Sequence, residues 1–183
     1  GYAGSSGSTD GTGTSARFNS PAEVILVGGN LYVADTQNHT IRKIVISSGE
    51  VTTLAGSAGS TGSADGSGTA ARFNWPHEIV NDGTNLYVAD SENHKIRKIV
   101  ISSGVVTTLA GSGSNSFADG TGTSAKFKTP RGLTFHDDNL YVGDRNNHKI
   151  RKITLRGTVT ADVNLHNLDD DTNATISLAS SDT

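Results

Sequence analysis

The chain has 183 residues, with 15 Lys and Arg against 18 Asp and Glu, and this net charge of −3 argues against a dedicated nucleic-acid binder. It has no cysteine, which excludes a disulfide scaffold, a thiol nucleophile and a cysteine-ligated metal centre. Hydrophobic residues make up 33% and aromatic residues 5%, so we expect a thin core divided between sheets.

No hydrophobic run approaches the roughly 18 residues of a membrane-spanning helix, and no signal-like segment opens the chain. The sequence therefore predicts no membrane span. It contains no methionine and begins at Gly1, which we interpret as a processed terminus or the start of a cut fragment.

Nearly the whole chain aligns with itself in three passes. An Asp-Gly pair opens each pass, at Asp10, Asp65 and Asp119, which lie 55 and 54 residues apart. Each pass then contains a Phe, a Pro, a Leu-Tyr-Val run, an Asp, an Asn-His pair and an Ile-Arg-Lys run in the same order. A period of this length indicates a solenoid or propeller unit.

Each repeat contains four short apolar runs with the pattern of β-strands and none with that of an amphipathic helix. In the middle repeat we expect strands at His77–Asn81, Asn85–Asp90, Lys95–Ile101 and Gly104–Ala110, joined by turns rich in Gly, Asn, Asp and Ser. A longer stretch rich in Gly, Ser and Thr, such as 111–129, then crosses to the next unit. Both faces of such a sheet are apolar, so neighbouring sheets must cover them, as in a propeller.

These motifs resemble the NHL repeat, whose name comes from an Asn-His-Leu triplet. The triplet stands here as Asn-His-Thr at 38–40 and as Asn-His-Lys at 93–95 and 147–149, followed by Ile-Arg-Lys each time. The resemblance covers about residues 1 to 160 and implies an all-β propeller of four-stranded antiparallel blades, with the first strand of each blade lining a central channel. Propellers of this family usually have six blades, so we expect the chain to be a segment of a six-bladed ring.

The expected division places propeller blades at 1–163. Residues 1–4 end a preceding blade, and the three repeats span 5–56, 57–111 and 112–163. We expect Gly157–Val163 to supply the last outer strand. Residues 164–183, with a turn at Asp169–Asn173 before Ala174–Ala179, form an added strand, a linker or the start of another domain.

Three blades cannot close a ring, because propellers close with four to eight blades. We therefore expect either a longer chain that supplies further blades or several copies that assemble, and we favour the longer chain. A fibre of stacked blades is the remaining alternative, since a contact that does not close a ring propagates.

Polar residues that recur in every repeat are best explained by the needs of every blade. Equivalent histidines lie one blade apart and cannot converge on one metal ion. We expect the recurring Asp and His to tie the turn between the second and third strands. This structural set comprises Asp35, His39, Arg42, Asp90, His94, Arg97, Asp144, His148 and Arg151.

The Asp-Gly-x-Gly loops raise calcium as an alternative to simple turns. Asp10, Asp65 and Asp119 offer hard oxygen ligands, but the loops lack the dense carboxylates that calcium needs. An Asp-capped turn with Gly at positive φ is the plainer interpretation. The run Asp169 to Asp171 is a second weak candidate, against a solvated acidic turn. We expect no cofactor, with calcium left open.

Positions that differ between repeats are the better candidates for a ligand site. They cluster around the Pro of each repeat, where the crossing loop enters the innermost strand beside the channel. Trp75, the only tryptophan, would suit a sugar or peptide, although it would also serve to cover the blade junction. The predicted ligand-binding residues are Glu23, Trp75, His77, Glu78, Arg131 and, further along its strand, His136.

The sequence thus favours a non-catalytic binding or structural module of a secreted or cell-surface protein of prokaryotic type. Its partners would be further blades or copies of itself, and a carbohydrate or protein ligand. The Arg-Lys pairs of the third strands do not favour RNA, because nearby acidic residues balance them and aromatic residues are scarce. The alternatives are a lyase or hydrolase with a metal-assisted site on the channel axis, or a subunit of an extracellular filament.

Overall fold

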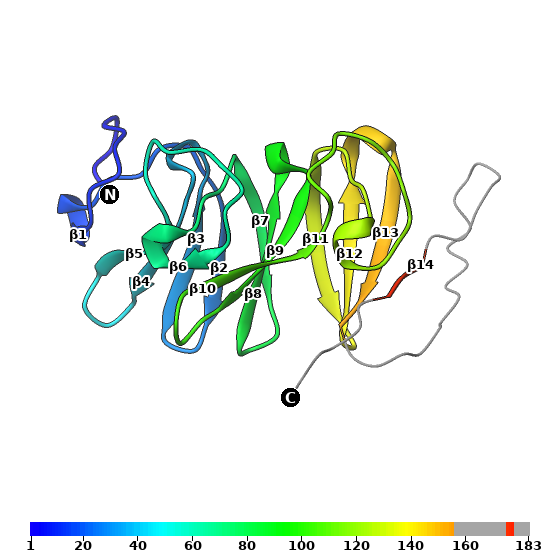
Figure 1. The fold of residues 1–183 in the computed structure, drawn as a ribbon. Helices are drawn as coiled ribbons and strands as arrows, with labels where there is room; N and C mark the ends of the chain where they lie inside the picture. The colour runs from blue at the N-terminus through cyan, green and yellow to red at the C-terminus, as the bar shows by residue number, and fades with distance from the viewer. Residues whose placement is uncertain (156–174, 178–183) are drawn as a thin grey trace.

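Three β-sheets stand side by side in the computed structural model, which describes residues 1–155 and 175–177 (Figure 1). We call these sheets blades 1, 2 and 3 in chain order. The described residues contain no α-helix, so the all-β prediction is confirmed. Short 3-10 turns connect the strands: η1 (Gly13–Ser15), η2 (Thr36–Asn38), η3 (Gly68–Ala70), η4 (Ser91–Asn93), η5 (Gly122–Ser124) and η6 (Arg145–Asn147).

The first two blades share one topology. Blade 1 has the order β1-β5-β4-β3-β2, and blade 2 has the order β6-β10-β9-β8-β7. All their pairs are antiparallel. The strands of blade 1 are β1 (Gly11–Thr12), β2 (Pro21–Val27), β3 (Asn30–Asp35), β4 (Thr40–Val45) and β5 (Glu50–Gly56). Those of blade 2 are β6 (Gly66–Ser67), β7 (Pro76–Asn81), β8 (Asn85–Asp90), β9 (Lys95–Val100) and β10 (Val105–Ala110).

The four strands predicted for the middle repeat are present, with ends within one residue of the expected ones. The structure adds a fifth, the two-residue strand β6, which pairs with the outer strand β10 through Ser67 and Gly66. Periodicity cannot reveal a strand of two residues. The crossing loop is therefore partly built into the sheet edge.

Blade 3 differs from the other two at its outer edge. It consists of β11 (Pro130–His136), β12 (Asn139–Asp144), β13 (Lys149–Thr154) and β14 (Thr175–Ser177). The last pair is parallel, with Lys152 opposite Thr175. The predicted strand at 157–163 and turn at 169–173 lie outside the described residues, whereas β14 falls inside the predicted segment 174–179.

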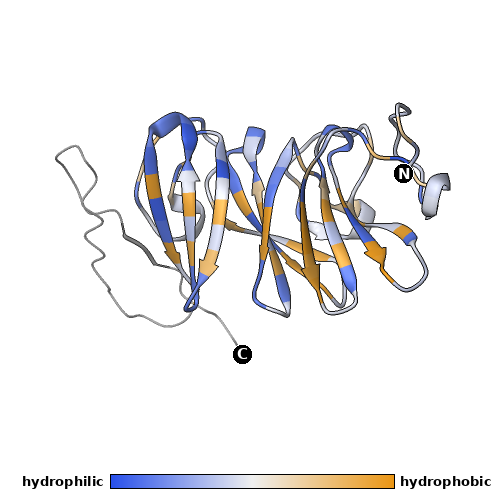
Figure 2. Cartoon of the chain, turned by 180° about the vertical axis from the view of Figure 1, so that it is seen from behind, coloured by the Kyte–Doolittle hydropathy of each residue, from blue (hydrophilic) through white to orange (hydrophobic). Residues whose placement is uncertain are grey.

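The hydrophobic core lies between the blades. One cluster joins blades 1 and 2 around Phe73, and a second joins blades 2 and 3 around Phe127. Each of these rings is fully buried and comes from the loop that precedes its own innermost strand. Figure 2 shows hydrophobic segments along the strands of all three sheets. Each sheet therefore shields the next from water, as a propeller requires.

A glycine makes room for each of these rings. Gly56 has a φ of +93°, and a Cβ there would lie 2.5 Å from the His39 carbonyl oxygen and 3.1 Å from the Phe73 ring. Gly111 stands in the same relation to His94 and Phe127. Alanine would therefore both strain the backbone and block the aromatic ring.

The innermost strands β2, β7 and β11 are neighbours around the inner edge of the three blades. Side chains near the starts of these strands therefore come from different blades but share one region. Among the described residues, no helix is long and apolar enough to cross a membrane.

Candidate functional site

A buried arginine in each blade joins two carboxylates. In blade 2, Arg97 donates to Asp90 and to Asp65, both at 2.7 Å, and its guanidinium lies over the Phe73 ring at 5.2 Å. The same pairs recur as Arg42 with Asp35 and Asp10, and as Arg151 with Asp144 and Asp119. This network ties β9 to the crossing loop and to the end of β8.

The aspartates of the crossing loops, Asp10, Asp65 and Asp119, form salt bridges with the arginines of this network. One oxygen of Asp65 accepts from Arg97 and from the Thr108 hydroxyl, and the other accepts from the Thr108 backbone N–H. Burial raises the pKa of Asp65, but these hydrogen bonds outweigh it and leave the pKa below its usual value. Within the described residues, no three His, Asp or Glu side chains gather as a metal site. The run Asp169 to Asp171 lies outside those residues.

The recurring histidine closes its own turn through its backbone N–H, which donates to the Thr36 carbonyl in blade 1, and its side chain reaches the next blade. His39 ends η2 in the left-handed conformation, and its Nδ1 accepts the backbone N–H of Trp75 at 3.2 Å. His94 accepts from Thr129 in the same way at 3.1 Å. At the start of these turns, the Thr36 hydroxyl donates to the Pro76 carbonyl, and Ser91 donates to Pro130. We call this pair of bonds the interblade clasp.

The predicted ligand residues near the strand starts come together. Glu23 lies in β2, His77 and Glu78 lie in β7, and Arg131 lies in β11. The negative charge of Glu23 raises the pKa of both His77 and Glu78, so charged side chains of blades 1 and 2 lie close enough to interact there. Arg131 and Arg145, which belong to blade 3, lower the pKa of His77. We call Glu23, His77, Glu78, Arg131 and Arg145 the axial cluster.

Burial and neighbouring charges favour the neutral forms of two side chains of the axial cluster, His77 and Glu78. Burial lowers the pKa of His77, the two arginines lower it further, and Glu23 only partly opposes them. Burial also raises the pKa of Glu78, and the negative charge of Glu23 adds to this effect. The site therefore favours the neutral form of both groups more than water does.

Arg145 is the member that the sequence reasoning missed. It begins η6 and stands where the other blades have Thr36 and Ser91, so a comparison of turn residues between repeats could have found it. Beside it, Gly132 and Gly143 face each other across β11 and β12, where blade 1 pairs Glu23 with Ala34.

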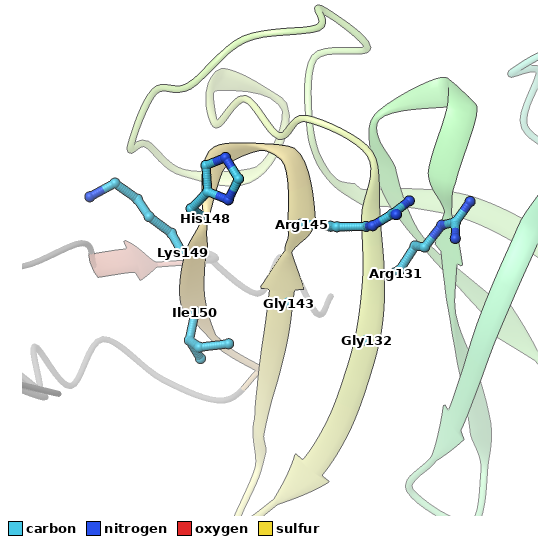
Figure 3. Close-up of a pocket in the computed structure, with 7 residues that line it drawn as sticks. All are labelled: Arg131, Gly132, Gly143, Arg145, His148, Lys149 and Ile150. Carbon is cyan, nitrogen blue, oxygen red and sulfur yellow. The ribbon is translucent and has the colours of Figure 1, made fainter. Parts of the chain in front are cut away.

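These changes leave a hollow of about 350 Å³ on the outer side of blade 3. Figure 3 shows Arg131 and Arg145 on one side of it, and His148 and Lys149 on the other. The lining residues are Arg131, Gly132, Gly143, Arg145, His148, Lys149 and Ile150.

Two other predicted ligand residues, His136 and Trp75, are not members of the axial cluster. His136 ends β11, about 16 Å along an extended strand from Arg131, and its side chain is exposed beside Asp137. As the sequence predicts, His136 therefore lies toward the other end of its strand, outside the axial cluster. Trp75 directly precedes β7 at the junction of blades 1 and 2, and it is 40% exposed. Its φ of 55° recurs at Ser20 and Thr129, so only its side chain is distinctive.

No protein-family model matches the chain. Among curated proteins, NHL repeat-containing protein 2 of Bos taurus is 37% identical over 136 residues, which cover 68% of this chain and 19% of that protein. Protein SUPPRESSOR OF QUENCHING 1, chloroplastic, of Arabidopsis thaliana is 35% identical over 134 residues, covering 68% of this chain and 13% of that protein. The chain thus spans a fifth or less of the curated relatives that it matches.

Solved structures share the arrangement of blades. A Bacteroides thetaiotaomicron protein, provisionally described as a phosphatase, superimposes with a TM-score of 0.62 at 24% identity over 75% of this chain and 35% of its own. An auxiliary nutrient binding protein of Bacteroides ovatus has a TM-score of 0.58 at 25% identity, over 72% of this chain and 37% of its own. The first of these likenesses bears on the fold alone.

Proposed function

Since this chain belongs to the NHL-repeat family, we propose that it is a non-catalytic binding module that holds a polar ligand at the axial cluster. One observation carries the proposal. Residues that differ between the repeats converge near the starts of the innermost strands, whereas the surrounding network is the same in every blade. A residue whose only role is to stabilise its blade should recur at the same position in the other blades, as the arginine and aspartate of the network do.

The axial cluster has an acidic side and a basic side. Glu23 and Glu78 occupy equivalent positions in blades 1 and 2, and Gly132 takes that position in blade 3. Blade 3 instead contributes Arg131 and Arg145. Such a cluster suits a small ligand rich in hydroxyl, amide or charged groups, and the half-exposed ring of Trp75 offers a surface for stacking.

The carboxylate pair itself supports a binding role. The negative charge of Glu23 raises the pKa of Glu78, which is unfavourable for folding alone, and perturbed groups of this kind concentrate at functional sites. A ligand that donates hydrogen bonds to Glu78 and accepts them from the arginines would offset this cost.

We further propose that the module works outside the cell or at its surface, where a nutrient-like ligand would be met. The likeness to the nutrient binding protein of Bacteroides ovatus supports this setting. Protease treatment of intact source cells tests it: cleavage of the chain without lysis is the expected result, and full protection until lysis would contradict it.

Binding can be followed through Trp75, because it is the only tryptophan of the chain. The probes are a panel of neutral oligosaccharides, uronic-acid oligosaccharides and short charged peptides. We expect at least one class to change the Trp75 emission saturably. Glu78→Gln and Arg131→Gln should each weaken that binding about tenfold or more, as the loss of a charged hydrogen bond implies.

His136→Gln is the matched control, because His136 lies on the same strand as Arg131 but at the other end. It should bind as the unaltered chain does. A panel without any saturable response, or equal losses in the His136 and Arg131 variants, would refute an axial ligand site.

A further inference from the structure

A β-bulge follows the proline at the start of each innermost strand. The regular pairing is interrupted at the same place in every blade, between Pro21 and Glu23, between Pro76 and Ile79, and between Pro130 and Gly132. A bulge turns a side chain out of the alternation of its strand, and bulges are frequent beside functional sites. The residue after the proline changes from Ala22 to His77 to Arg131. The same backbone feature therefore presents a different side chain from each blade.

The side chains of the axial cluster have no hydrogen-bond or ion-pair partner among the described residues. Four of the five are half-buried, and Arg145 is exposed. The Nε atom of Arg131 is buried without an acceptor, and Arg131 holds no carboxylate through its other nitrogens, unlike the recurring arginines of the blades. Polar groups removed from water are normally paired, so we attribute the missing partners to a bound molecule.

The charges of the cluster are divided into two poles. Glu23 and Glu78, at equivalent positions of blades 1 and 2, form the acidic pole, and Arg131 and Arg145 of blade 3 form the basic pole. Burial lowers the pKa of His77, both arginines lower it further, and Glu23 raises it. His77 is therefore within electrostatic reach of both poles and lies between them.

The basic pole is directed toward the neighbouring blade. Figure 3 shows the side chains of Arg131 and Arg145 extending from blade 3 in the same direction, toward the green strands of blade 2. This direction agrees with their effect on His77, which belongs to blade 2. Two guanidinium groups without an acidic partner favour an anion, and their planar donors match the two oxygens of a carboxylate.

The acidic pole requires the opposite charge. Burial raises the pKa of Glu78, and the negative charge of Glu23 raises it further. A cation beside the two carboxylates would relieve this repulsion, whereas a hydroxyl group would relieve it less. A ligand that suits both poles therefore carries an ammonium group and a carboxylate.

We propose that the axial cluster binds a small zwitterion, an amino acid or a short peptide with free termini. Its carboxylate lies on Arg131 and Arg145, and its ammonium group lies on Glu23 and Glu78. This inference rests on the proposed function, because it names the ligand class of the same site. A uronic acid would leave the acidic pole without a counter-charge, and a neutral sugar would leave both poles without one.

Titration calorimetry of the chain with glycine, diglycine, triglycine and tetraglycine tests the proposal, because these zwitterions differ in the separation of their charges. We expect saturable binding that is tightest at one length. The N-acetylated and C-amidated forms of that compound each lack one charge and should bind about tenfold or more weakly. Capped and uncapped forms that bind equally would overturn the proposal.

Two variants assign each charge of the ligand to its pole. Glu78→Gln should abolish the penalty of N-acetylation and keep that of C-amidation, and Arg131→Gln should do the reverse. A residue with a merely structural role would weaken every form alike, and that result would overturn the assignment. Glu50→Gln is the matched control, since Glu50 is exposed on the outer strand β5, at the other side of its sheet from β2. It should bind every form as the unaltered chain does.

The outcomes separate this inference from the proposed function. A saccharide that binds at the axial cluster, together with no response to any of the glycine compounds, would overturn the zwitterion and leave the binding module standing. A lack of saturable binding by every saccharide and peptide would overturn both. Circular dichroism of each variant verifies that the loss of binding is not a loss of fold.

Discussion

At the scale of single residues, those that recur in every blade stabilise the fold, whereas those that differ between blades are the candidates for ligand binding. The buried Asp90 and Arg97 have equivalents with the same contacts in both other blades, and removing either partner would leave a charge buried alone. Glu78 is different, because burial and the charge of Glu23 both raise its pKa. The protein therefore keeps a carboxyl group where folding alone would favour a neutral one.

Glu78→Gln should stabilise the chain at neutral pH by about 0.5–1 kcal/mol, the gain usual for relieving a strained functional position. The folded pKa of Glu78 lies above its unfolded value, so the native state holds more protons between the two, and stability falls as pH rises through that window. The advantage of the variant should therefore vanish below the unfolded pKa. Urea unfolding at several pH values measures it.

Glu92→Gln is the control for this prediction, since Glu92 is exposed in η4 and lies in the same blade. It should change stability by less than about 0.5 kcal/mol at every pH, as surface substitutions usually do. A Glu78→Gln variant that is destabilised at neutral pH would mean that the carboxylate supports the fold.

The sequence could identify most of the axial cluster but not all of it. Glu23, Glu78 and Arg131 lie within two residues after the proline of their repeats, so comparison of the repeats singles them out. Arg145 lies 14 residues further along and joins them only because β11 and β12 form a hairpin. His136 lies at the other end of β11, where the sequence also places it, so it is separate from the axial cluster.

At the scale of elements, the turn between the second and third strands joins neighbouring blades. His94 closes its turn through the backbone and accepts the buried N–H of Thr129 through its side chain. The sequence predicts the strands well, because alternating apolar runs and turn residues define them locally. It does not predict the partner of the histidine, because that bond depends on where the next blade is placed.

His94→Asn should therefore destabilise the chain by about 1–3 kcal/mol, since asparagine tolerates the left-handed backbone but leaves the Thr129 N–H without its acceptor. His148→Asn is the matched control, because His148 has the same backbone conformation but no following blade among the described residues. In the monomer it should change stability by less than about 0.5 kcal/mol. Chemical unfolding of dilute protein compares the two.

Equal losses in the two variants would show that the histidine acts within its own turn.

At the scale of the whole molecule, three blades in a row form a short linear array. Each blade is stabilised by its own sheet and by the faces that its neighbours cover, and among the described residues only blade 2 packs against a blade on both faces. Burial of one Val- or Leu-sized side chain contributes about 1.5–3 kcal/mol. The middle blade should accordingly be the most stable part of the described chain.

Hydrogen exchange measures this gradient directly. In dilute protein, the amides of β8 should exchange at least about tenfold more slowly than those of β3 and β12, a difference of about 1.4 kcal/mol in local stability. Equal protection in all three strands would mean that the blades unfold as one cooperative unit. The gradient thus reports how much of the stability of each blade comes from the blade beside it.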